Sequence, residues 1–218
     1  MGLFEIYNYW NTGLSHPVSR DWFVSSPFPL LLLTVGYLYF VLYAGPRYMK
    51  NRTPFKLRTV ILIYDLIQIL ANLWLLKQQY EAGCFVILTE ISVKNCWRQY
   101  ASIFDVPKLH IAGWYGLLLK IFDFIETCIF VLRKKQNQVS VLHVYHHISN
   151  VTFVWIALKY FMDVRTAYVT IVNCIVHVIM YMYYFISAWS PNLQRMMSPI
   201  KPFITILQMA SINTIFCN

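Results

Sequence analysis

Long apolar stretches separated by short polar segments run along the whole chain. Three intervals contain no Asp, Glu, Lys or Arg at all, and they cover residues 22–46, 136–158 and 166–194. A helix needs about 20 mainly apolar residues to cross the roughly 30 Å hydrocarbon core of a bilayer, so each interval is long enough. The pattern therefore predicts helices that span a membrane.

Three further stretches complete the predicted set of spans. Two are apolar but contain ionisable residues, with one acid in the first and one base and two acids in the second, and the third is charge-free but short. We predict an all-α, polytopic membrane helical bundle that forms one domain over residues 1–218. Its six spans are predicted at about 28–45, 59–76, 111–132, 139–159, 167–188 and 203–217.

The composition agrees with a membrane protein and excludes a soluble one. Charged residues make up only 12% of the chain, about half of the roughly 25% usual in soluble proteins. The net charge of +9 would suggest nucleic acid in a soluble protein. Here the basic residues concentrate in residues 47–58 and 133–135, which contain no acid. By the positive-inside rule these segments are cytoplasmic loops, so we expect no nucleic-acid partner.

The five cysteines contain no C-x-x-C pair, so they indicate neither a zinc site nor a dense disulfide framework. Cys84, Cys96 and Cys217 fall on the predicted lumenal side, which is an oxidising compartment. Whether any of them form a disulfide stays open at this stage.

Ionisable groups inside predicted spans are the first candidates for function, because they are costly in a bilayer and usually face a protein interior. In the third span, Lys120, Asp123 and Thr127 are spaced i, i+3, i+7 and share one helical face. Glu126 lies close to that face. The alternative interpretation is an ion-paired patch that only fixes helix packing.

The fourth span carries the sharpest signal in the chain. His143, His146 and His147 follow the spacing i, i+3, i+4, which places three imidazoles on one side of a helix. A single histidine on an apolar face is more often a packed core residue than a catalyst. Three that converge inside a membrane span indicate a site.

A stripe of polar and aromatic residues on the fifth span is equally consistent with helix packing and with a site. Its members, at spacing i, i+4, i+7, i+8, i+11, are Asn173, His177, Met180, Tyr181 and Tyr184. Smaller sets on the second and last spans are most simply interpreted as interhelical hydrogen bonding. They consist of Asp65, Gln68, Asn72, Thr205 and Gln208.

In this order and spacing, the motifs resemble the ELO family of very-long-chain fatty acid elongases, over roughly residues 28–215. The matching motifs are Lys-x-x-Asp-x-x-Glu-Thr at 120–127, His-x-x-His-His at 143–147, Asn-x-x-x-His-x-x-Met-Tyr-x-Tyr-Tyr at 173–184, and Thr-x-x-Gln at 205–208.

The chain also departs from the usual family pattern. Relative to that pattern, Asp123 and Glu126 are exchanged, and Ser211 replaces a second Gln. Family members usually continue into a seventh span and a cytoplasmic tail. We therefore expect this chain to be C-terminally truncated.

The resemblance implies an acyltransferase that condenses a long-chain acyl-CoA with malonyl-CoA to a 3-ketoacyl-CoA, CO₂ and CoA, the first step of fatty acid elongation. An imidazole can activate the acyl group by forming an acyl-imidazole. The resemblance places this nucleophile in the histidine box, and we choose His146. His177 is the candidate for assisting acylation or polarising the thioester.

The same resemblance assigns supporting roles to other polar residues. Donors to the enolate charge would come from His143, His147, Asn173, Tyr181 and Gln208. Tyr184 and Thr205 are further substrate-binding candidates. Asp123 and Glu126 would orient the histidines and tune their basicity, with Lys120 balancing the charge.

Basic residues beside the spans are candidates for the phosphates of CoA. They are Arg133, Lys134, Lys135 and Lys201. The positive-inside rule explains the same residues without any ligand, so both interpretations stay open.

The expected partners are acyl-CoA, malonyl-CoA and the lipid bilayer, in the membrane of the endoplasmic reticulum. The reductases and dehydratase of the elongation cycle and a second copy of the chain are further candidate partners. We expect no cofactor, because the condensation has no redox step, and no metal. Acyl chain length, saturation preference and the activity of the short form are not determined by the sequence.

Two other functional classes compete with this one. Membrane di-iron desaturases and hydroxylases also carry H-x-x-H-H boxes, because imidazoles bind iron, but they need about eight histidines. This chain has six, of which His16 and His110 lie near lumenal segments. The other alternative is a catalytically inactive, truncated elongase paralogue.

Overall fold

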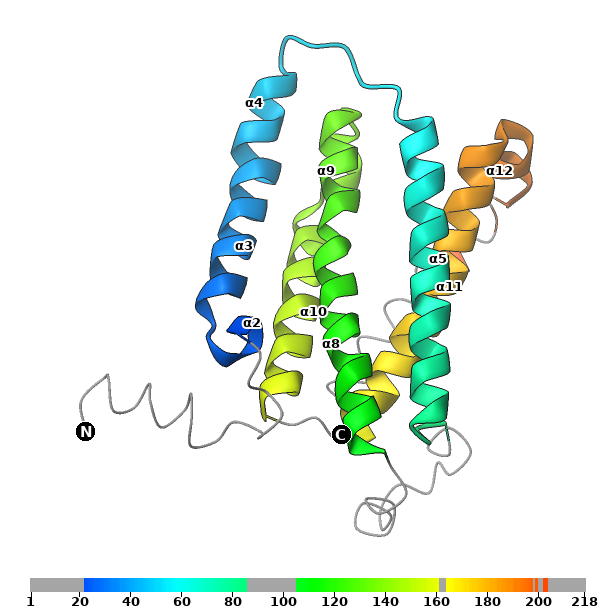
Figure 1. Cartoon of the computed structure of the whole chain (residues 1–218). Helices are drawn as coiled ribbons and strands as arrows, with labels where there is room; N and C mark the ends of the chain where they lie inside the picture. Colours follow the sequence, from blue (N-terminus) through cyan, green and yellow to red (C-terminus); the bar gives the residue numbers. More distant parts are fainter. Residues whose placement is uncertain (1–21, 86–104, 161–163, 198, 200–201, 204–218) are drawn as a thin grey trace, which may run out of the picture. The chain divides into compact units, whose positions relative to one another are not determined.

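The computed structural model describes residues 22–85, 105–160, 164–197, 199 and 202–203. Within these ranges the ordered elements are all helices (Figure 1), which confirms the all-α class. The chain divides into two compact units. Unit 1 comprises residues 1–56 and 116–162, and unit 2 comprises residues 57–115 and 163–218. That the two units make one membrane domain stays a prediction.

Unit 1 contains the first and fourth predicted spans. Its helices are α2 (Trp22–Ser25), α3 (Phe28–Tyr39), the π-helix η2 (Phe40–Ala44), α4 (Gly45–Met49), the end of α8 (Val106–Phe122), α9 (Phe124–Leu132), the 3₁₀ turn η3 (Gln136–Gln138) and α10 (Val141–Tyr160). Helices α3, η2 and α4 follow one another as a single helical run (Figure 1).

A close backbone approach joins α4 to α9. A Cβ atom added at Gly45 would lie 2.7 Å from Cγ1 of Val131 and 2.8 Å from the carbonyl oxygen of Phe40. Small residues let membrane helices approach closely, and Gly45 is therefore the residue that permits this contact. The π-turn directly before it widens the helix where the approach occurs.

The short helix α2 is attached to the end of α10 by two side chains. Lys159 is 1% exposed, and its Nζ donates to the carbonyl oxygen of Ser25 at 2.7 Å. Trp155 Nε1 donates to the carbonyl oxygen of Phe23 at 3.3 Å, and its ring lies 5.0 Å from Lys159 Nζ. The buried ammonium group of Lys159, near the end of a predicted span, is thus hydrogen-bonded to the backbone of α2.

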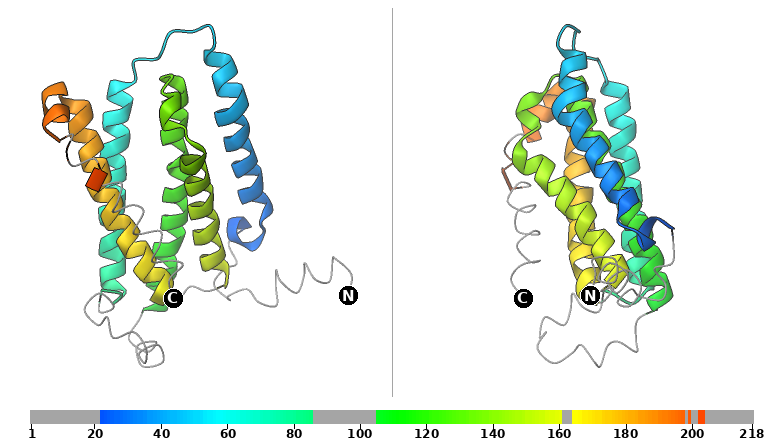
Figure 2. Two further views of the ribbon diagram at one scale, coloured as in Figure 1. Left: turned by 180° about the vertical axis from the view of Figure 1, so that it is seen from behind. Right: turned by 90° about the vertical axis from the view of Figure 1, so that its left-hand side faces the viewer.

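Unit 2 is built on two long helices, α5 (Arg58–Glu81) and α11 (Val164–Trp189), which lie side by side (Figure 2). The start of α8 and the short helix α12 (Pro191–Met197) complete it. Arg58 donates from Nε and Nη2 to the carbonyl oxygens of Ala188 and Trp189, at 3.0 and 2.6 Å. The start of α5 therefore meets the end of α11, and the pair is antiparallel.

Three of the described helices are long and apolar enough to cross a membrane. They cover Phe28–Met49, Arg58–Glu81 and Thr166–Trp189, and the predicted spans 28–45, 59–76 and 167–188 overlap them closely. Large apolar side chains are exposed along them, among them Leu32 and Leu70 at 76% and 58%. In water such exposure would be unfavourable, whereas lipid solvates it. The chain is a membrane protein with several spans.

The third predicted span, 111–132, is interrupted. Helix α8 ends at Phe122 and α9 begins at Phe124, with Asp123 between them. The amide of Glu126 bonds the carbonyl oxygen of Asp123 at 3.2 Å, a tighter turn than that of an α-helix. The Asp123 side chain makes no cap hydrogen bond to α9, and its backbone stays in the right-handed helical region. Almost all of the last predicted span, 203–217, lies outside the described residues.

Candidate functional site

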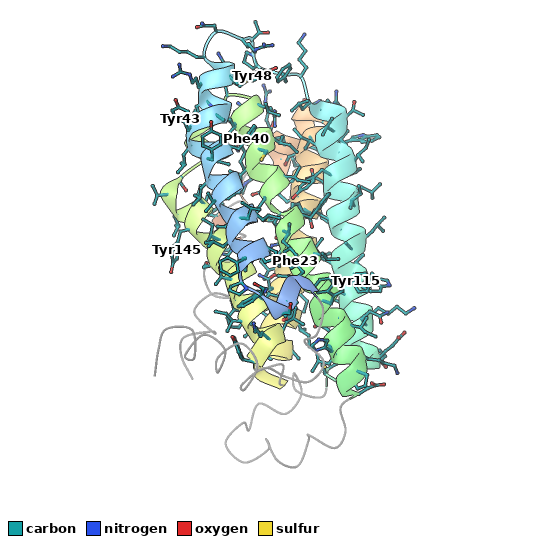
Figure 3. All side chains as sticks on the ribbon, turned by 60° about the vertical axis from the view of Figure 1, so that its left-hand side comes forward. Phe23, Phe40, Tyr43, Tyr48, Tyr115 and Tyr145 are labelled. Atoms are coloured by element: carbon teal, nitrogen blue, oxygen red, sulfur yellow. The ribbon has the colours of Figure 1, made fainter. Side chains whose placement is uncertain are left out.

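The three histidines of α10 lie together, as their spacing predicts. The ring centroids of His143 and His147 are 4.3 Å apart, and those of His146 and His147 are 5.9 Å apart. His147 is buried, while the other two are half-buried. Tyr145, on the opposite side of the helix, projects outward (Figure 3) and is 65% exposed. The imidazoles therefore share the face that packs inside unit 1.

The two carboxylates on this side of unit 1 have different partners. Oε2 of Glu126 lies 3.9 Å from Nε2 of His147, and Oδ2 of Asp123 lies 3.2 Å from Nζ of Lys120. All four side chains are buried. A buried charge is tolerated when it is paired, so Asp123 and Lys120 compensate each other. The distance from Glu126 to His147 is longer than a hydrogen bond, and the role of orienting a histidine stays a prediction for both carboxylates.

The third imidazole, His143, is hydrogen-bonded to a threonine. Oγ1 of Thr127 lies 3.1 Å from Nε2 of His143, and the hydroxyl of Tyr37 donates to the same Oγ1 at 3.0 Å. The Tyr37 ring stacks on Phe124, with centroids 4.1 Å apart and planes 11° apart. Helices α3, α9 and α10 therefore meet at this histidine.

His146 is bonded within its own helix. Nδ2 of Asn150 lies 2.9 Å from Nε2 of His146. An amide nitrogen can only donate, so this Nε2 accepts, and the neutral ring carries its proton on Nδ1. The amide of Asn150 thus covers Nε2, one of the two ring nitrogens through which His146 could attack an acyl group.

Sequence reasoning missed Tyr37 and Asn150 as members of this cluster. Asn150 follows His146 by four residues, which is helix-neighbour spacing, so a local signal for it exists. Tyr37 lies 90 residues away from Thr127, in a span that contains several aromatic residues. No spacing rule separates it from its neighbours Tyr39 and Tyr43.

In unit 2, the stripe on α11 faces α5, as the packing interpretation expects. Tyr181 is fully buried, and its hydroxyl lies 3.4 Å from that of Tyr64 on α5. Gln68 donates to the hydroxyl of Tyr64 at 2.8 Å, and Asn72 donates to the carbonyl oxygen of Gln68, also at 2.8 Å. Of the polar residues predicted on the second span, Gln68 and Asn72 thus form hydrogen bonds within α5, and the contact to α11 is made by Tyr64.

His177 also has a defined tautomer. Its Nδ1 lies 2.8 Å from the carbonyl oxygen of Asn173. A carbonyl oxygen only accepts, so Nδ1 carries the proton and Nε2 of the neutral ring does not. The ring centroid of Tyr181 lies 5.9 Å from that of His177 and 6.1 Å from that of Tyr184. The predicted residues of the α11 stripe thus form one cluster within unit 2.

The basic residues after α9 have a structural role. The amide of Lys135 bonds the carbonyl oxygen of Phe130 at 2.9 Å, and that of Lys134 bonds the carbonyl oxygen of Val131 at 3.0 Å. Lys134 adopts a φ of 56°. These are the features of a Schellman motif that ends a helix, where cations also favour the helix dipole. Lys134 and Lys135 are exposed, and Nζ of Lys134 donates to the carbonyl oxygen of Lys50 at 3.4 Å.

Several predicted residues lie outside the described ranges, namely Thr205, Gln208, Lys201, Cys96 and Cys217. Cys84 is a buried free thiol. It lies beyond the end of α5. Burial raises the pKa of its thiol to about 11. A disulfide to this residue would require it to become accessible.

Among the residues that the structure describes, one set of side chains has the composition of a metal site. The donor atoms of Glu126, His143 and His147 all lie within 4.8 Å of one another. A carboxylate with two imidazoles suits a transition-metal ion. The set comprises three ligands, fewer than the two-iron centres of membrane desaturases use.

The chain is similar to proteins of one family. The profile of "ELO: GNS1/SUR4 family" matches residues 22–217. "Very long chain fatty acid elongase 4" of Mus musculus is 34% identical over 212 residues, which are 94% of this chain and 64% of the relative. "Very long chain fatty acid elongase 7" of Drosophila melanogaster is 32% identical over 196 residues, which are 89% of this chain and 58% of the relative. "Very long chain fatty acid elongase F" of the same organism is 36% identical over 198 residues, covering 85% and 72%. The chain thus spans less than two thirds of the length of the first two.

Proposed function

Because the chain belongs to the ELO (GNS1/SUR4) family, we propose that it catalyses the condensation of a long-chain acyl-CoA with malonyl-CoA. The products are a 3-ketoacyl-CoA two carbons longer, CO₂ and CoA. Curated relatives are named very long chain fatty acid elongases, and this condensation begins an elongation cycle. The observation that carries the proposal is the group of three imidazoles inside unit 1, with Glu126 beside His147.

Acylation of a histidine is the first proposed step. The unprotonated nitrogen of His146 attacks the thioester carbonyl, and the carbon–sulfur bond breaks. The imidazolium formed gives its proton to the departing CoA thiolate. Because Asn150 donates to Nε2 of His146, its side chain must release that nitrogen before an attack from Nε2.

Condensation is the second proposed step. Malonyl-CoA loses CO₂, and its electron pair remains as an enolate on the thioester. The enolate carbon attacks the acyl carbonyl, the carbon–nitrogen bond breaks, and the imidazole recovers one proton from solvent. The overall reaction consumes one proton and transfers no electrons, so we propose no redox cofactor.

The surrounding groups support these steps by hydrogen bonding and charge. Glu126 is placed to stabilise a protonated His147, and a donor from His143 or His147 would stabilise the enolate. His177 remains our candidate for assisting acylation, and its unprotonated Nε2 suits a base. The roles of Asn173, Tyr181, Tyr184, Thr205 and Gln208 stay predictions.

The proposed setting follows from the membrane helices and the charges. The acyl chain would lie among apolar helices, and the CoA phosphates would meet Arg133, Lys134, Lys135 and Lys201 on the cytoplasmic side. We place the protein in the membrane of the endoplasmic reticulum. The reductases and dehydratase of the cycle and a second copy of the chain are proposed partners.

The decisive experiment uses the purified 218-residue chain in lipid nanodiscs. Incubation with acyl-CoA alone should leave an acyl mass on the peptide that contains His146, and addition of malonyl-CoA should remove it as 3-ketoacyl-CoA. His146→Ala should lose both signals, while Tyr145→Phe, which alters an exposed neighbour, should keep them. An acyl-CoA that binds without forming an adduct or product would instead identify an inactive paralogue.

The group formed by Glu126, His143 and His147 favours a metal-dependent lipid oxidase as the second candidate. Stoichiometric iron in the purified protein, together with oxygen consumption on addition of lipid, would support that candidate and contradict the elongase.

A further inference from the structure

Tyr37 stands outside every motif that identifies the family, yet it contacts the histidine cluster. It comes from α3, is only 6% exposed, and donates its hydroxyl proton to Oγ1 of Thr127 at 3.0 Å. Thr127 is fully buried. A buried hydroxyl without a partner costs roughly 1–3 kcal/mol, so this bond is a stable feature of unit 1.

The direction of the hydrogen bonds determines the state of a histidine. Thr127 has one hydroxyl proton, and its oxygen already accepts the proton of Tyr37. The proton of Thr127 is therefore available for Nε2 of His143, 3.1 Å away. A ring that accepts at Nε2 carries its own proton on Nδ1 when neutral.

Packing holds the phenol of Tyr37 in this position. Its ring is stacked on Phe124 at 4.1 Å, and the Phe124 ring in turn lies edge-on to His147, with centroids 6.5 Å apart. The hydroxyl therefore cannot swing away without disturbing the stack. One residue thus separates Tyr37 from each of two histidines, Thr127 in the case of His143 and Phe124 in the case of His147.

We propose that Tyr37 is a positioning residue for the histidine box, which acts through Thr127 to fix His143 as the tautomer protonated on Nδ1. His143 then presents an N–H on the side of its ring away from Thr127. This inference rests on the proposed function in one respect: that N–H is the donor we assign to the enolate. The tautomer itself is a property of the folded protein and does not depend on turnover.

The test compares tyrosines on the same helix. Tyr37→Phe removes only the hydroxyl and keeps the stack on Phe124, whereas Tyr39→Phe removes the hydroxyl of an exposed tyrosine two residues away. In protein labelled with ¹⁵N-histidine, NMR should show the Nδ1-protonated state of His143 in the original chain and in Tyr39→Phe. Tyr37→Phe should show a mixture of both tautomers.

Threonine variants connect the tyrosine to the histidine. Thr127→Val should also produce the mixture, while Thr127→Ser, which keeps the hydroxyl, should restore a single tautomer. Adding Tyr37→Phe to Thr127→Val should have no further effect, because residues that act through one bond are not additive. In the condensation assay, Tyr37→Phe should lower kcat by roughly threefold to tenfold, the size of one neutral hydrogen bond, with KM changed less than twofold.

An unchanged tautomer of His143 in Tyr37→Phe would overturn the proposal, and so would an additive effect in the double variant. If the original chain makes no 3-ketoacyl-CoA, the proposed function fails, while the NMR comparison still decides the role of Tyr37. If Tyr37→Phe does not fold, Thr127→Val and Thr127→Ser still test the bond to His143 through which Tyr37 is proposed to act, and an unchanged tautomer in Thr127→Val would overturn the proposal.

Discussion

At the scale of single residues, the three imidazoles of α10 are chemically distinct although they share one helix face. His143 faces a hydroxyl, His146 faces an amide and His147 faces a carboxylate. An amide nitrogen can only donate, so His146 accepts at Nε2, and we propose the same for His143, while Glu126 lies 3.9 Å from Nε2 of His147. Histidines on one helix face therefore meet three different polar groups.

The amide of Asn150 should protect His146 from acylating reagents. Asn150→Leu removes the donor that covers Nε2, so His146 should react with diethyl pyrocarbonate roughly threefold to tenfold faster, the size of one neutral hydrogen bond. Mass spectrometry of the modified peptide measures this rate. Ser149→Ala is the control, because that hydroxyl bonds the carbonyl oxygen of His146 and not its ring. Equal rates in both variants would show that the amide does not cover the nitrogen.

The thiol of Cys84 should be unreactive in the folded protein. Burial raises its pKa to about 11, and only the thiolate reacts with maleimides. Labelling should therefore be slow at pH 7, rise as the pH approaches 11, and become fast after denaturation in detergent. Rapid labelling of Cys84 at neutral pH, mapped by peptide mass, would contradict the buried position.

At the scale of elements, polar residues both join and interrupt the helices. Arg58 closes the antiparallel pair of α5 and α11, and Lys159 attaches α2 to α10. Asp123 separates α8 from α9 and pairs with Lys120 one turn earlier. The break brings Glu126 and Thr127 into the first turn of α9, where they face two of the histidines.

The contact between α4 and α9 should depend on Gly45. Gly45→Ala would place a Cβ 2.7 Å from Cγ1 of Val131, so one helix must move, and overpacking of this kind costs about 1–3 kcal/mol. We expect a lower thermal midpoint for the variant in nanodiscs.

Gly36→Ala is the matched control on the neighbouring turns, because nothing lies within 4 Å of its added Cβ and alanine favours helices. It should leave the midpoint unchanged or raise it slightly. If both alanine variants have the same thermal midpoint, the effect of Gly45→Ala does not come from its close contact with Val131.

At the scale of the whole molecule, the chain is a membrane protein of the ELO family with several apolar helices. The proposed reaction needs imidazole, carboxylate and hydroxyl groups, and these are the groups that unit 1 gathers. The metal-like set of Glu126, His143 and His147 consists of the same side chains. Metal dependence therefore separates the two candidate functions.

Removal of metal ions should leave condensation intact. After dialysis against a chelator, the protein should form 3-ketoacyl-CoA at the original rate, and iron and zinc measured by mass spectrometry should fall well below one atom per chain. Activity lost on dialysis and restored by one metal ion would show that the cluster is a metal site.

Particular elements show how far sequence reasoning reached. The spans around 28–45, 59–76 and 167–188 and the common face of the histidines follow from local apolar length and helical period, and the structure has them. Asp123 is a single turn residue between α8 and α9 inside the predicted span 111–132, and whether these helices form one span stays a prediction. Asp65, Gln68 and Asn72 were predicted only as general interhelical bonding, whereas the structure shows Gln68 bonded to Tyr64 of its own helix and Tyr64 next to Tyr181 of α11.

The sequence by itself determined the helical, membrane-embedded class, the family and the side of α10 that carries the imidazoles, because apolar length and residue spacing are local properties. The tertiary structure decided which group each imidazole meets, with Glu126 beside His147 and Tyr37 reaching His143 through Thr127. A bond between residues 90 positions apart depends on how helices pack against one another. That packing is set by many contacts together, and no spacing along one helix contains it.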